Sequence, residues 1–226
     1  MRFDSKIVEN LKESPRVHII RLSKPADFSF RPGQWVSVWC DDFVDEKNNP
    51  VHRAFSIASF QDEPHIELCI ARGTGLSAHL QDSPAGTAVH VDGPYGAFSL
   101  KEGKKCLFIA GGVGISVFRP MIRQALNEGK QVLLIYSMRI PAEFLYRKEF
   151  ESLDHKNFKV VPTITVDHHY KTWEGEQGRI QSFLKKYYKK DFDVYLCGPP
   201  PMVEAVIENL KQMKHPESRI FLDKWS

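Results

Sequence analysis

Three glycines in four positions mark the segment GGVGIS, residues 111–116, which ends the apolar run CLFIAGG. An apolar run that ends in glycines before a stretch of helical periodicity indicates a strand, a turn and the start of a helix. Glycines there let the backbone approach a ligand closely, and the first N–H groups of a helix suit a phosphate. The spacing is not Gly-x-Gly-x-x-Gly, so this motif alone does not identify a dinucleotide site.

A second strand end carries LCGPPP, residues 196–201, with Cys197 and Gly198 at its tip. Ligands of open parallel sheets bind outside the carboxyl ends of the strands. Two such ends in one part of the chain favour a nucleotide site over two merely tight turns.

The segment RAFSIAS, residues 53–59, alternates as a half-buried strand does, with Phe55 and Ile57 on one face. Its arginine and its serines add chemistry that a strand does not need. A guanidinium is a planar bidentate donor for phosphate. Taken in isolation, a surface ion pair for Arg53 and a core position for Phe55 explain the segment equally well.

Short runs that alternate on a period of two fill the chain up to about residue 100, and turn signals such as RPGQ, SPAG and GPYG separate them. Strands at this spacing predict a barrel or a sandwich. The predicted strands are residues 17–22, 35–40, 53–59, 65–71 and 88–93.

After the segment KEGKK, residues 101–105, the pattern changes to apolar strands that alternate with amphipathic stretches, which predicts a parallel sheet covered on both faces. The predicted strands are residues 106–112, 131–137, 158–165 and 193–198. A periodic apolar stretch follows the first strand to residue 126, the amphipathic segment FLYRKEFESL, residues 144–153, follows the second, and helices are predicted at 180–188 and 201–211. We therefore expect two domains, 1–102 and 103–226: an antiparallel β-barrel and an α/β domain.

Composition narrows the function classes. The 226 residues are 42% hydrophobic and 26% charged, as in ordinary globular proteins, and the net charge of +3 is too small to indicate a nucleic-acid binder. Residues 1–102 hold 11 Lys/Arg against 14 Asp/Glu, giving −3, whereas residues 103–226 hold 20 against 14, giving +6. The basic excess includes Lys185, Lys186, Lys189 and Lys190, which suit an acidic partner or a solvated helix face.

Neither a leader nor a metal site is expected. The N-terminal segment has no apolar core of a signal peptide, and no stretch approaches the roughly 18 apolar residues of a membrane span. The four cysteines are at least 29 residues apart, so no pair has the close spacing of a zinc or iron-sulfur site. We expect a cytoplasmic enzyme with reduced thiols and no metal centre.

Five segments carry a resemblance over almost the whole chain: RAFSIAS, ARGTGLSAHL, GPYG followed by Phe98, AGGVGISVF and CGPPPM. Their order and spacing resemble the ferredoxin-NADP reductase-like flavoprotein superfamily. The resemblance implies that the barrel binds a flavin and that the α/β domain binds NAD(P)H.

In that family the first motif lies along the flavin. The resemblance implies that Arg53 pairs with the phosphates, that Phe55 replaces the usual tyrosine as a stacking ring, and that Ser56 reaches flavin N5. The segment around residues 72–77 matches the pyrophosphate loop, which favours FAD over FMN. The implied flavin residues are Arg53, Ala54, Phe55, Ser56, Ile70, Ala71, Arg72, Gly75, Leu76 and Ser77.

The glycine turn of the α/β domain is the implied pyridine-nucleotide loop. This chain departs from the family pattern there, because the proline that usually closes the loop is delayed to Pro120. Ser137 and Arg139, with Arg147, would hold a 2′-phosphate, and no acidic residue stands at the strand tip, so NADPH is favoured over NADH. The implied nucleotide residues are Gly112, Gly114, Ile115, Ser116, Ser137, Arg139, Cys197, Gly198, Pro199 and Met202.

The C-terminal LDKWS matches a family pattern in which an acidic residue precedes an aromatic by two positions. Asp223 and Trp225 have that spacing, and Trp225 would cover the flavin where the nicotinamide enters. The alternative is a tryptophan that fills a surface groove. With Ser56 and Cys197, which would lie beside the nicotinamide, Asp223 and Trp225 form the candidate catalytic set.

The resemblance implies an FAD-dependent NAD(P)H oxidoreductase that moves a hydride between nicotinamide and flavin N5 and passes electrons singly to an external acceptor, such as an acidic ferredoxin or an oxygenase component. Three alternatives stay open. They are a free-flavin reductase, an electron-transfer subunit of a larger complex, and a nucleotide-binding module without turnover.

Overall fold

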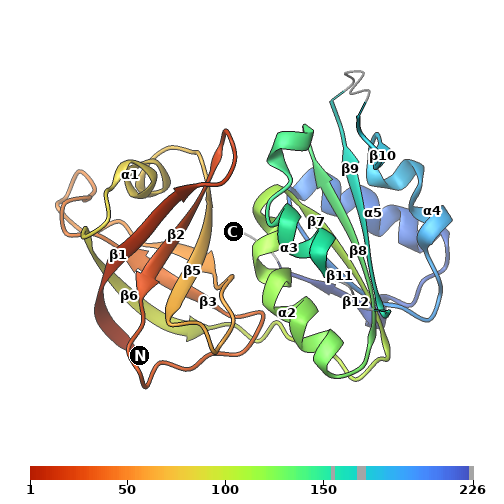
Figure 1. Cartoon of the computed structure of the whole chain (residues 1–226), viewed down its shortest axis with the longest axis horizontal. Helices are drawn as coiled ribbons and strands as arrows, with labels where there is room; N and C mark the ends of the chain where they lie inside the picture. The colour runs from red at the N-terminus through yellow and green to blue at the C-terminus, as the bar shows by residue number, and fades with distance from the viewer. Residues whose placement is uncertain (154–155, 167–171, 224–226) are drawn as a thin grey trace. The chain divides into compact units, whose positions relative to one another are not determined.

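Two units make up the structure, residues 1–99 and residues 100–226, where the sequence pattern places the change of architecture after residue 102. The computed structural model describes residues 1–153, 156–166 and 172–223 (Figure 1). Within these residues no helix combines the length and the apolar character needed to cross a membrane.

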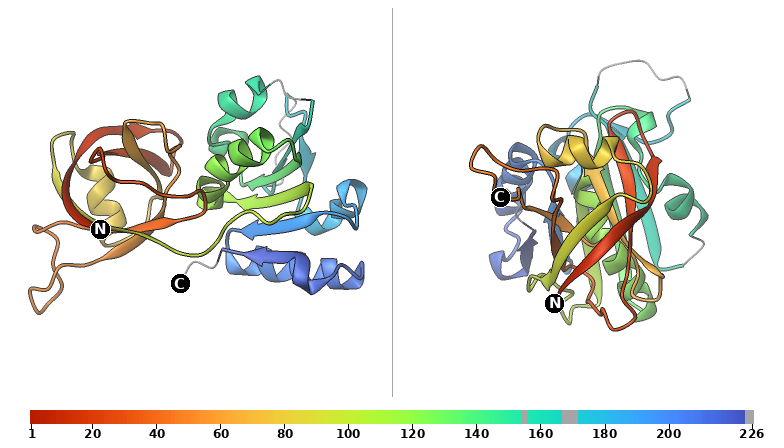
Figure 2. Two further views of the ribbon diagram at one scale, coloured as in Figure 1. Left: turned by 90° about the horizontal axis from the view of Figure 1, so that it is seen from below. Right: turned by 90° about the vertical axis from the view of Figure 1, so that its left-hand side faces the viewer.

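Residues 1–99 form six strands that pair antiparallel in the order β4-β3-β6-β1-β2-β5. The two end strands approach each other, because an antiparallel bridge joins Ile57 to Leu68 and the Ala58 N–H donates to the Glu67 carbonyl at 2.8 Å. The sheet is thus a nearly closed barrel (Figure 2), which confirms the predicted fold class. The strands are β1 (Arg2–Lys12), β2 (Val17–Ser23), β3 (Trp35–Trp39), β4 (Arg53–Ser56), β5 (His65–Ala71) and β6 (Ala88–Tyr95).

Alternating apolar side chains fill the barrel, as period-two strands require. Val36 and Val38 of β3 and Ile20 and Leu22 of β2 are fully buried in one cluster. Helix α1 (Leu76–Asp82) follows β5 and closes that core with Leu76 and Leu80, which are four positions apart and so share one helix face.

Strand β1 is the barrel element that sequence reasoning does not predict. Only Ser5 and Ile7 of its eleven residues are buried, so its hydrophobic alternation is weak. A bulge between Ile7 and Glu9 also shifts its register against β2 and breaks the period that a sequence pattern would reveal.

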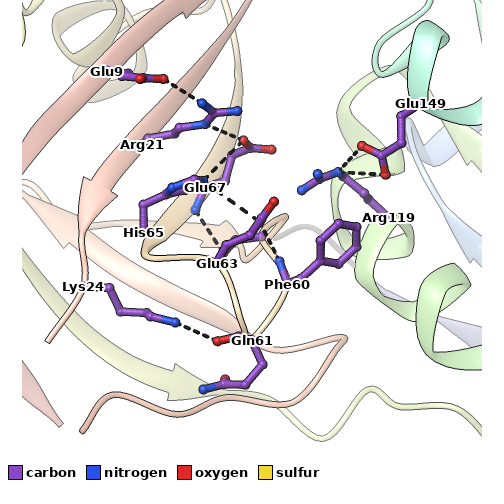
Figure 3. A network of polar contacts seen from close by, with 11 residues as sticks. Glu9, Arg21, Lys24, Phe60, Gln61, Glu63, His65, Glu67, Arg119 and Glu149 are labelled. Atoms are coloured by element: carbon purple, nitrogen blue, oxygen red, sulfur yellow. Dashed lines mark hydrogen bonds and ion pairs between the residues drawn. The ribbon is translucent and has the colours of Figure 1, made fainter. Parts of the chain in front are cut away.

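A polar network lies on the β1-β2-β5 part of the barrel (Figure 3). Arg21 donates from Nε to Glu67 at 2.8 Å and from Nη1 to Glu9 at 2.7 Å. Glu67 is almost fully buried, so this charge-assisted bond compensates a carboxylate that would otherwise lack solvation. Burial lowers the pKa of neighbouring His65.

Within the described part of residues 100–226, six strands form a parallel sheet in the order β10-β9-β8-β7-β11-β12, as predicted. The strands are β7 (Lys105–Gly111), β8 (Gln131–Met138), β9 (Phe158–Ile164), β10 (Glu176–Gln177), β11 (Asp193–Cys197) and β12 (Ile220–Leu222). The helices are α2 (Ile115–Asn127), α3 (Arg147–Ser152), α4 (Leu184–Tyr187) and α5 (Pro200–Gln212).

Helices cover both faces of this sheet, with α2 and α3 on one face and α4 and α5 on the other (Figures 1 and 2). In β7, Leu107 and Ile109 belong to the cluster that includes Leu210 of α5, while the Phe108 ring lies 5.1 Å from the Phe118 ring of α2. A strand buried on both sides must be apolar at every position, which explains the continuous run at residues 106–110.

The helix predicted at residues 180–188 is wrong in detail. The chain forms a 3₁₀ turn at Ile180–Ser182 and a single α-helical turn, α4, with a break at Phe183. Ile180, Phe183 and Leu184 are buried at spacings of three and four, a pattern that a 3₁₀ turn satisfies as well as an α-helix.

Candidate functional site

The parallel sheet changes winding direction beside β7. The chain runs from β7 to β8 and β9 on one side, and later returns to place β11 on the other side. At such a switch point the connections after adjacent strands diverge, and a crevice opens at the strands' carboxyl ends. The glycine turn follows β7 and the CGPP segment follows β11, so both motifs lie at this point.

Each glycine of the turn after β7 is required for a different physical reason. Gly112 has φ +53°, the left-handed region, and a Cβ there would meet nothing within 4 Å. Gly114 has an ordinary helical φ of −60°, but its Cβ would lie 2.4 Å from the Cys197 carbonyl oxygen. A Cβ on Gly111 would lie 2.7 Å from Sδ of Met202. Glycine therefore lets the loops after β7 and β11 pack backbone against backbone.

Helix α2 begins at Ile115 and continues through Pro120. Proline has no N–H, so the Ser116 carbonyl lacks its usual partner four residues later. The Ser116 hydroxyl oxygen is buried and has no hydrogen-bond partner among the described residues. A buried hydroxyl without a partner is costly, and this one stands in the first turn of a helix, where unbonded N–H groups gather.

Tyr136 supports the turn and is a residue that sequence reasoning misses. It is fully buried near the end of β8, and its hydroxyl donates to the Gly112 carbonyl at 3.0 Å. The signal in the sequence is a hydroxyl at the end of the apolar run 132–135 of β8. Its partner cannot be deduced from that strand alone.

A guanidinium and a carboxylate, those of Arg139 and Glu143, both belong to the end of β8. Ser137 is buried opposite Gly111, while Arg139 is exposed and makes no recorded ion pair with the described residues. The Arg139 backbone N–H donates to the Glu143 carboxylate at 3.1 Å. The expectation that no acidic residue stands at this tip is therefore wrong, because the 3₁₀ turn Pro141–Glu143 brings one back to it. Arg147 is engaged elsewhere, with Glu151 at 2.8 Å.

Helix α2 is tied to α3 by a buried arginine. Arg119 donates from Nε to both oxygens of Glu149, at 3.1 and 2.8 Å (Figure 3). Its guanidinium also lies 5.0 Å from the centre of the Tyr146 ring. These contacts fix the helix whose first turn carries the glycine loop.

Cys197 and Asp223, which are 26 residues apart in the sequence, are neighbours in the structure. Cys197 is fully buried, and its thiol donates to an Asp223 carboxylate oxygen at 3.6 Å. The Asp223 N–H donates to the Leu196 carbonyl at 3.0 Å, which extends the pairing of β12 with β11. Trp225, predicted to act with them, lies outside the described residues.

The segment after Cys197 packs against the glycine turn. A Cβ on Gly198 would lie 2.9 Å from the Gly111 nitrogen and 2.7 Å from Cε of Met202. Pro199 precedes the first turn of α5, which begins at Pro200. The structure thus brings together Gly112, Gly114, Ile115 and Ser116 with Cys197, Gly198, Pro199 and Met202.

In the barrel, the β4 residues divide between surface and core. Arg53 and Ala54 are exposed and Ser56 is half-buried, so all three are accessible to a ligand. Phe55 is only 4% exposed and belongs to the barrel core cluster. Most of the surface of this ring is thus used in packing, and its stacking on a flavin stays a prediction.

The loop after β5 is more open than the loop after β7. Gly75 has φ +65°, and a Cβ on it would meet nothing closer than 4.0 Å. Ala71 is exposed, whereas Leu76 and Ser77 are buried at the start of α1. Ile70 is buried too, and its carbonyl accepts a hydrogen bond from Gln81 at 2.7 Å.

Arg72 in this loop is already paired. Its guanidinium donates to both oxygens of Asp82, at 2.6 and 3.1 Å, and this hydrogen bonding lowers the pKa of Asp82. Arg53, in contrast, makes no ion pair with the other residues that the structure describes. Of the two predicted phosphate ligands in the barrel, Arg53 is the available one.

Comparison with known proteins gives consistent results. The family model of the oxidoreductase NAD-binding domain matches residues 108–208. The reductase component of phenol 2-monooxygenase from Pseudomonas sp. (strain CF600) is 30% identical over 225 residues, which cover 94% of this chain and 62% of that protein. This chain thus spans about three fifths of that relative's length.

Two further matches extend over both units. Ferredoxin–NADP reductase B of Sorangium cellulosum (strain So ce56) is 28% identical over 224 residues, which cover 91% of this chain and 90% of that protein. A crystal structure of a ferredoxin NADP⁺ reductase from Neisseria gonorrhoeae with bound FAD and NADP superposes with a TM-score of 0.84 at 22% identity, covering 98% of each chain. The two-unit architecture is therefore shared along its whole length.

Proposed function

We propose that this chain, which belongs to the ferredoxin-NADP reductase-like superfamily of flavoproteins, is an FAD-dependent oxidoreductase that takes a hydride from NAD(P)H and passes electrons singly to an external acceptor. The observation that carries the proposal is the glycine turn at the sheet's switch point. In the helix turn behind it lies the buried Ser116 hydroxyl, which has no hydrogen-bond partner among the residues that the structure describes. FAD, when bound, supplies the hydride-accepting and one-electron chemistry that side chains lack.

For the pyridine nucleotide, the residues present fit a pyrophosphate. Gly112 and Gly114 lie in the turn that leads into α2, and Ile115 closes this turn, since its N–H already donates to the Gly112 carbonyl. Ser116 offers a hydroxyl that has no hydrogen-bond partner among the described residues and that a phosphate oxygen would satisfy. Cys197, Gly198, Pro199 and Met202 are proposed to line the nicotinamide side, because they pack against this turn. Asp223 would hold the Cys197 thiol in one orientation through their hydrogen bond.

The choice between NADPH and NADH is proposed to rest on Arg139 and Glu143. A free guanidinium favours the 2′-phosphate of NADPH, and a carboxylate favours the 2′-hydroxyl of NADH. Because Glu143 already accepts a bond from the Arg139 backbone, it can remain in place while the Arg139 side chain turns toward a phosphate. We therefore expect both nucleotides to be used, with NADPH preferred.

For FAD, we propose that Arg53 binds the phosphates, that Ala54 and Ser56 contact the ring, and that the loop from Ala71 to Gly75 with Leu76 and Ser77 holds the pyrophosphate. Two observations support this assignment: Arg53 is exposed and has no ion-pair partner in the described part of the chain, and the backbone at Gly75 is open. Ile70 contributes by anchoring the loop. Arg72 contributes less, because Asp82 holds its guanidinium.

The electron acceptor is proposed to be a separate, acidic redox protein, such as a ferredoxin or an oxygenase component. The reductase component of phenol 2-monooxygenase supports this class of partner by its name. The +6 charge of residues 103–226 would increase the association rate with an acidic protein. We place this chemistry in the cytoplasm, where buried thiols such as Cys40 and Cys106 remain reduced.

An anaerobic titration tests the proposal. The purified full chain is examined for flavin absorbance and then titrated with NADPH and with NADH. We expect a bound flavin that bleaches near one equivalent of NADPH, and Arg139→Ala should raise the KM for NADPH more than that for NADH. Glu143→Gln is the matched control and should shift the preference the other way.

The alternatives predict different outcomes. A free-flavin reductase purifies without flavin but oxidises NAD(P)H when flavin is added. A nucleotide-binding module binds NADPH without oxidising it in the presence of FAD and ferricyanide, and that result would overturn the enzyme assignment.

A further inference from the structure

Three metal-binding side chains converge in the barrel, on residues that the proposed flavin and nucleotide sites do not use. The sulfur of Cys40, a carboxylate oxygen of Asp42 and an imidazole nitrogen of His79 all lie within 4.8 Å of one another. Nε2 of His79 and Oδ1 of Asp42 are 3.1 Å apart. His79 is 37 residues beyond Asp42, so the group exists only in the folded chain.

Backbone structure holds the three side chains in place. The Phe43 N–H donates to the Cys40 carbonyl at 3.3 Å, which closes a tight turn that contains both Cys40 and Asp42. The His79 N–H donates to the Gly75 carbonyl at 3.1 Å, in the first turn of α1. The Phe43 and His79 rings lie 5.1 Å apart, which ties the turn to the helix.

The separations suit a tetrahedral ion. Metal–ligand distances of about 2.0–2.3 Å put neighbouring donors of a tetrahedral zinc site roughly 3.3–3.8 Å apart. The spacing between His79 and Asp42 is already close to this value, and no two of the three donors need approach by more than about 1.5 Å. The side chains of Asp42 and His79 are partly exposed, so they have room to rotate toward the sulfur.

Two of the three donors are at least partly exposed, which gives the ion a path from solvent. Cys40 is fully buried, His79 is 25% exposed and Asp42 is 68% exposed. An ion would therefore enter past Asp42 and His79 and reach the sulfur beneath them. Three protein donors leave the fourth tetrahedral position for water.

We propose that Cys40, Asp42 and His79 bind one divalent transition-metal ion, and that Zn²⁺ is the best match. A thiolate with an imidazole excludes Ca²⁺ and Mg²⁺, which require oxygen donors, and matches the borderline-soft zinc ion. Binding replaces the thiol proton, which leaves to solvent, and the hydrogen bond between Asp42 and His79. No oxidation state changes.

A second histidine close to this turn provides the control. His90 lies 2.9 Å from Asp41 and 2.8 Å from Asp4, so both ring nitrogens already have carboxylate partners. The His90 cluster resembles the proposed site because a histidine meets carboxylates in both. Among the described residues, however, no cysteine sulfur converges with the His90 cluster. Removing His90 should therefore leave metal binding intact.

Co²⁺ alone, added to the whole 226-residue chain loaded with flavin, is the probe. We expect one equivalent to produce the visible bands of tetrahedral cobalt and a thiolate-to-cobalt charge-transfer band in the difference spectrum, and Zn²⁺ to displace it. Cys40→Ser should abolish the charge-transfer band, while Cys106→Ser, at another buried thiol, should not. His79→Gln should weaken binding by more than about 100-fold, because a lost ligand costs at least as much as a lost outer contact; His90→Gln should not.

The proposal is overturned by cobalt binding without a charge-transfer band, by equal affinities for His79→Gln and His90→Gln, or by no binding. If Cys40→Ser does not fold, Asp42→Asn and His79→Gln decide the matter, because both side chains are partly exposed. Flavin absorbance and its bleaching by NADPH are read on the same samples. Failure of the reductase function is thus separate from failure of the metal site.

Discussion

In the barrel unit, the turn after β5 enters α1 through Gly75, and in the sheet unit the turn after β7 enters α2 through Gly112–Gly114. Gly75 has φ +65° and ψ −143°, a conformation that residues with a Cβ avoid, yet the space around it is open. Gly114 has a conformation that any residue adopts, but the Cys197 carbonyl occupies the place of its Cβ. Glycine is thus required at position 75 for its backbone conformation and at position 114 for the absence of a Cβ in a crowded place.

The difference has a functional meaning. The strain that a residue with a Cβ would suffer at position 75 is local, so it concerns the proposed flavin loop alone. Crowding at Gly114 couples the two loops that would hold the pyridine nucleotide, because moving one displaces the other. We therefore expect the nucleotide site to be rigid and the flavin loop to be adaptable.

The largest effect should come from adding one methyl group to each turn. Gly114→Ala forces backbone against backbone and should lower the free energy of unfolding by about 3 kcal/mol, the upper range for overpacking. Gly75→Ala only strains the backbone and should lower the free energy of unfolding by about 1–2 kcal/mol. Urea denaturation followed by circular dichroism measures both. If Gly75→Ala costs as much as Gly114→Ala, the distinction between strain and crowding is wrong.

The next effect separates the two arginines of the proposed flavin site. Arg53→Ala should weaken FAD binding by about 30-fold, because a charge-assisted hydrogen bond contributes about 2 kcal/mol. Arg72→Ala should change the affinity only a few-fold, since Asp82 already holds its guanidinium. Fluorescence titration of flavin-free protein with FAD gives both constants, with Arg53→Lys as the charge-preserving control. A larger loss at Arg72 would reverse the assignment.

A smaller effect should follow from removing one hydroxyl behind the nucleotide turn. Tyr136→Phe deletes the bond to the Gly112 carbonyl, worth about 1 kcal/mol, and should raise the dissociation constant for NADPH about fivefold. FAD affinity should not change, because Tyr136 supports a turn of the sheet unit and the proposed flavin residues belong to the barrel. A matching loss of FAD affinity would show that the hydroxyl acts on overall stability instead.

The smallest expected effect is a difference in pKa between one histidine of each unit. The hydrogen bond to Asp41 raises the pKa of His90, so its contribution to stability is complete below pH 6.5 and is lost as pH rises through the folded value. Burial lowers the pKa of His215, so its contribution is complete above pH 6.5 and is lost as pH falls. NMR titration of the ring protons between about pH 8 and about pH 5 should find the two pKa values on opposite sides of 6.5.

Much of the fold can be predicted from the sequence, because periodicity and turn chemistry act between neighbouring residues. Alternation on a period of two indicates the barrel strands, and continuous apolar runs indicate strands buried on both faces. The same local signals place Gly112 and Gly198 at strand ends, where a parallel sheet binds ligands. Strand β1 is missed because its surface position and its bulge weaken the very pattern that would reveal it.

Other features depend on tertiary structure alone. Packing decides that Phe55 belongs to the core, that Tyr136 supports Gly112, and that Glu143 returns to the tip of β8. Packing also brings His79 to Asp42 and Cys40, which no spacing rule for neighbouring ligands can detect. The sequence by itself determines what each segment can do, since propensity and backbone sterics are local. Only the folded chain decides which distant side chains meet, because that depends on how buried surfaces fit together.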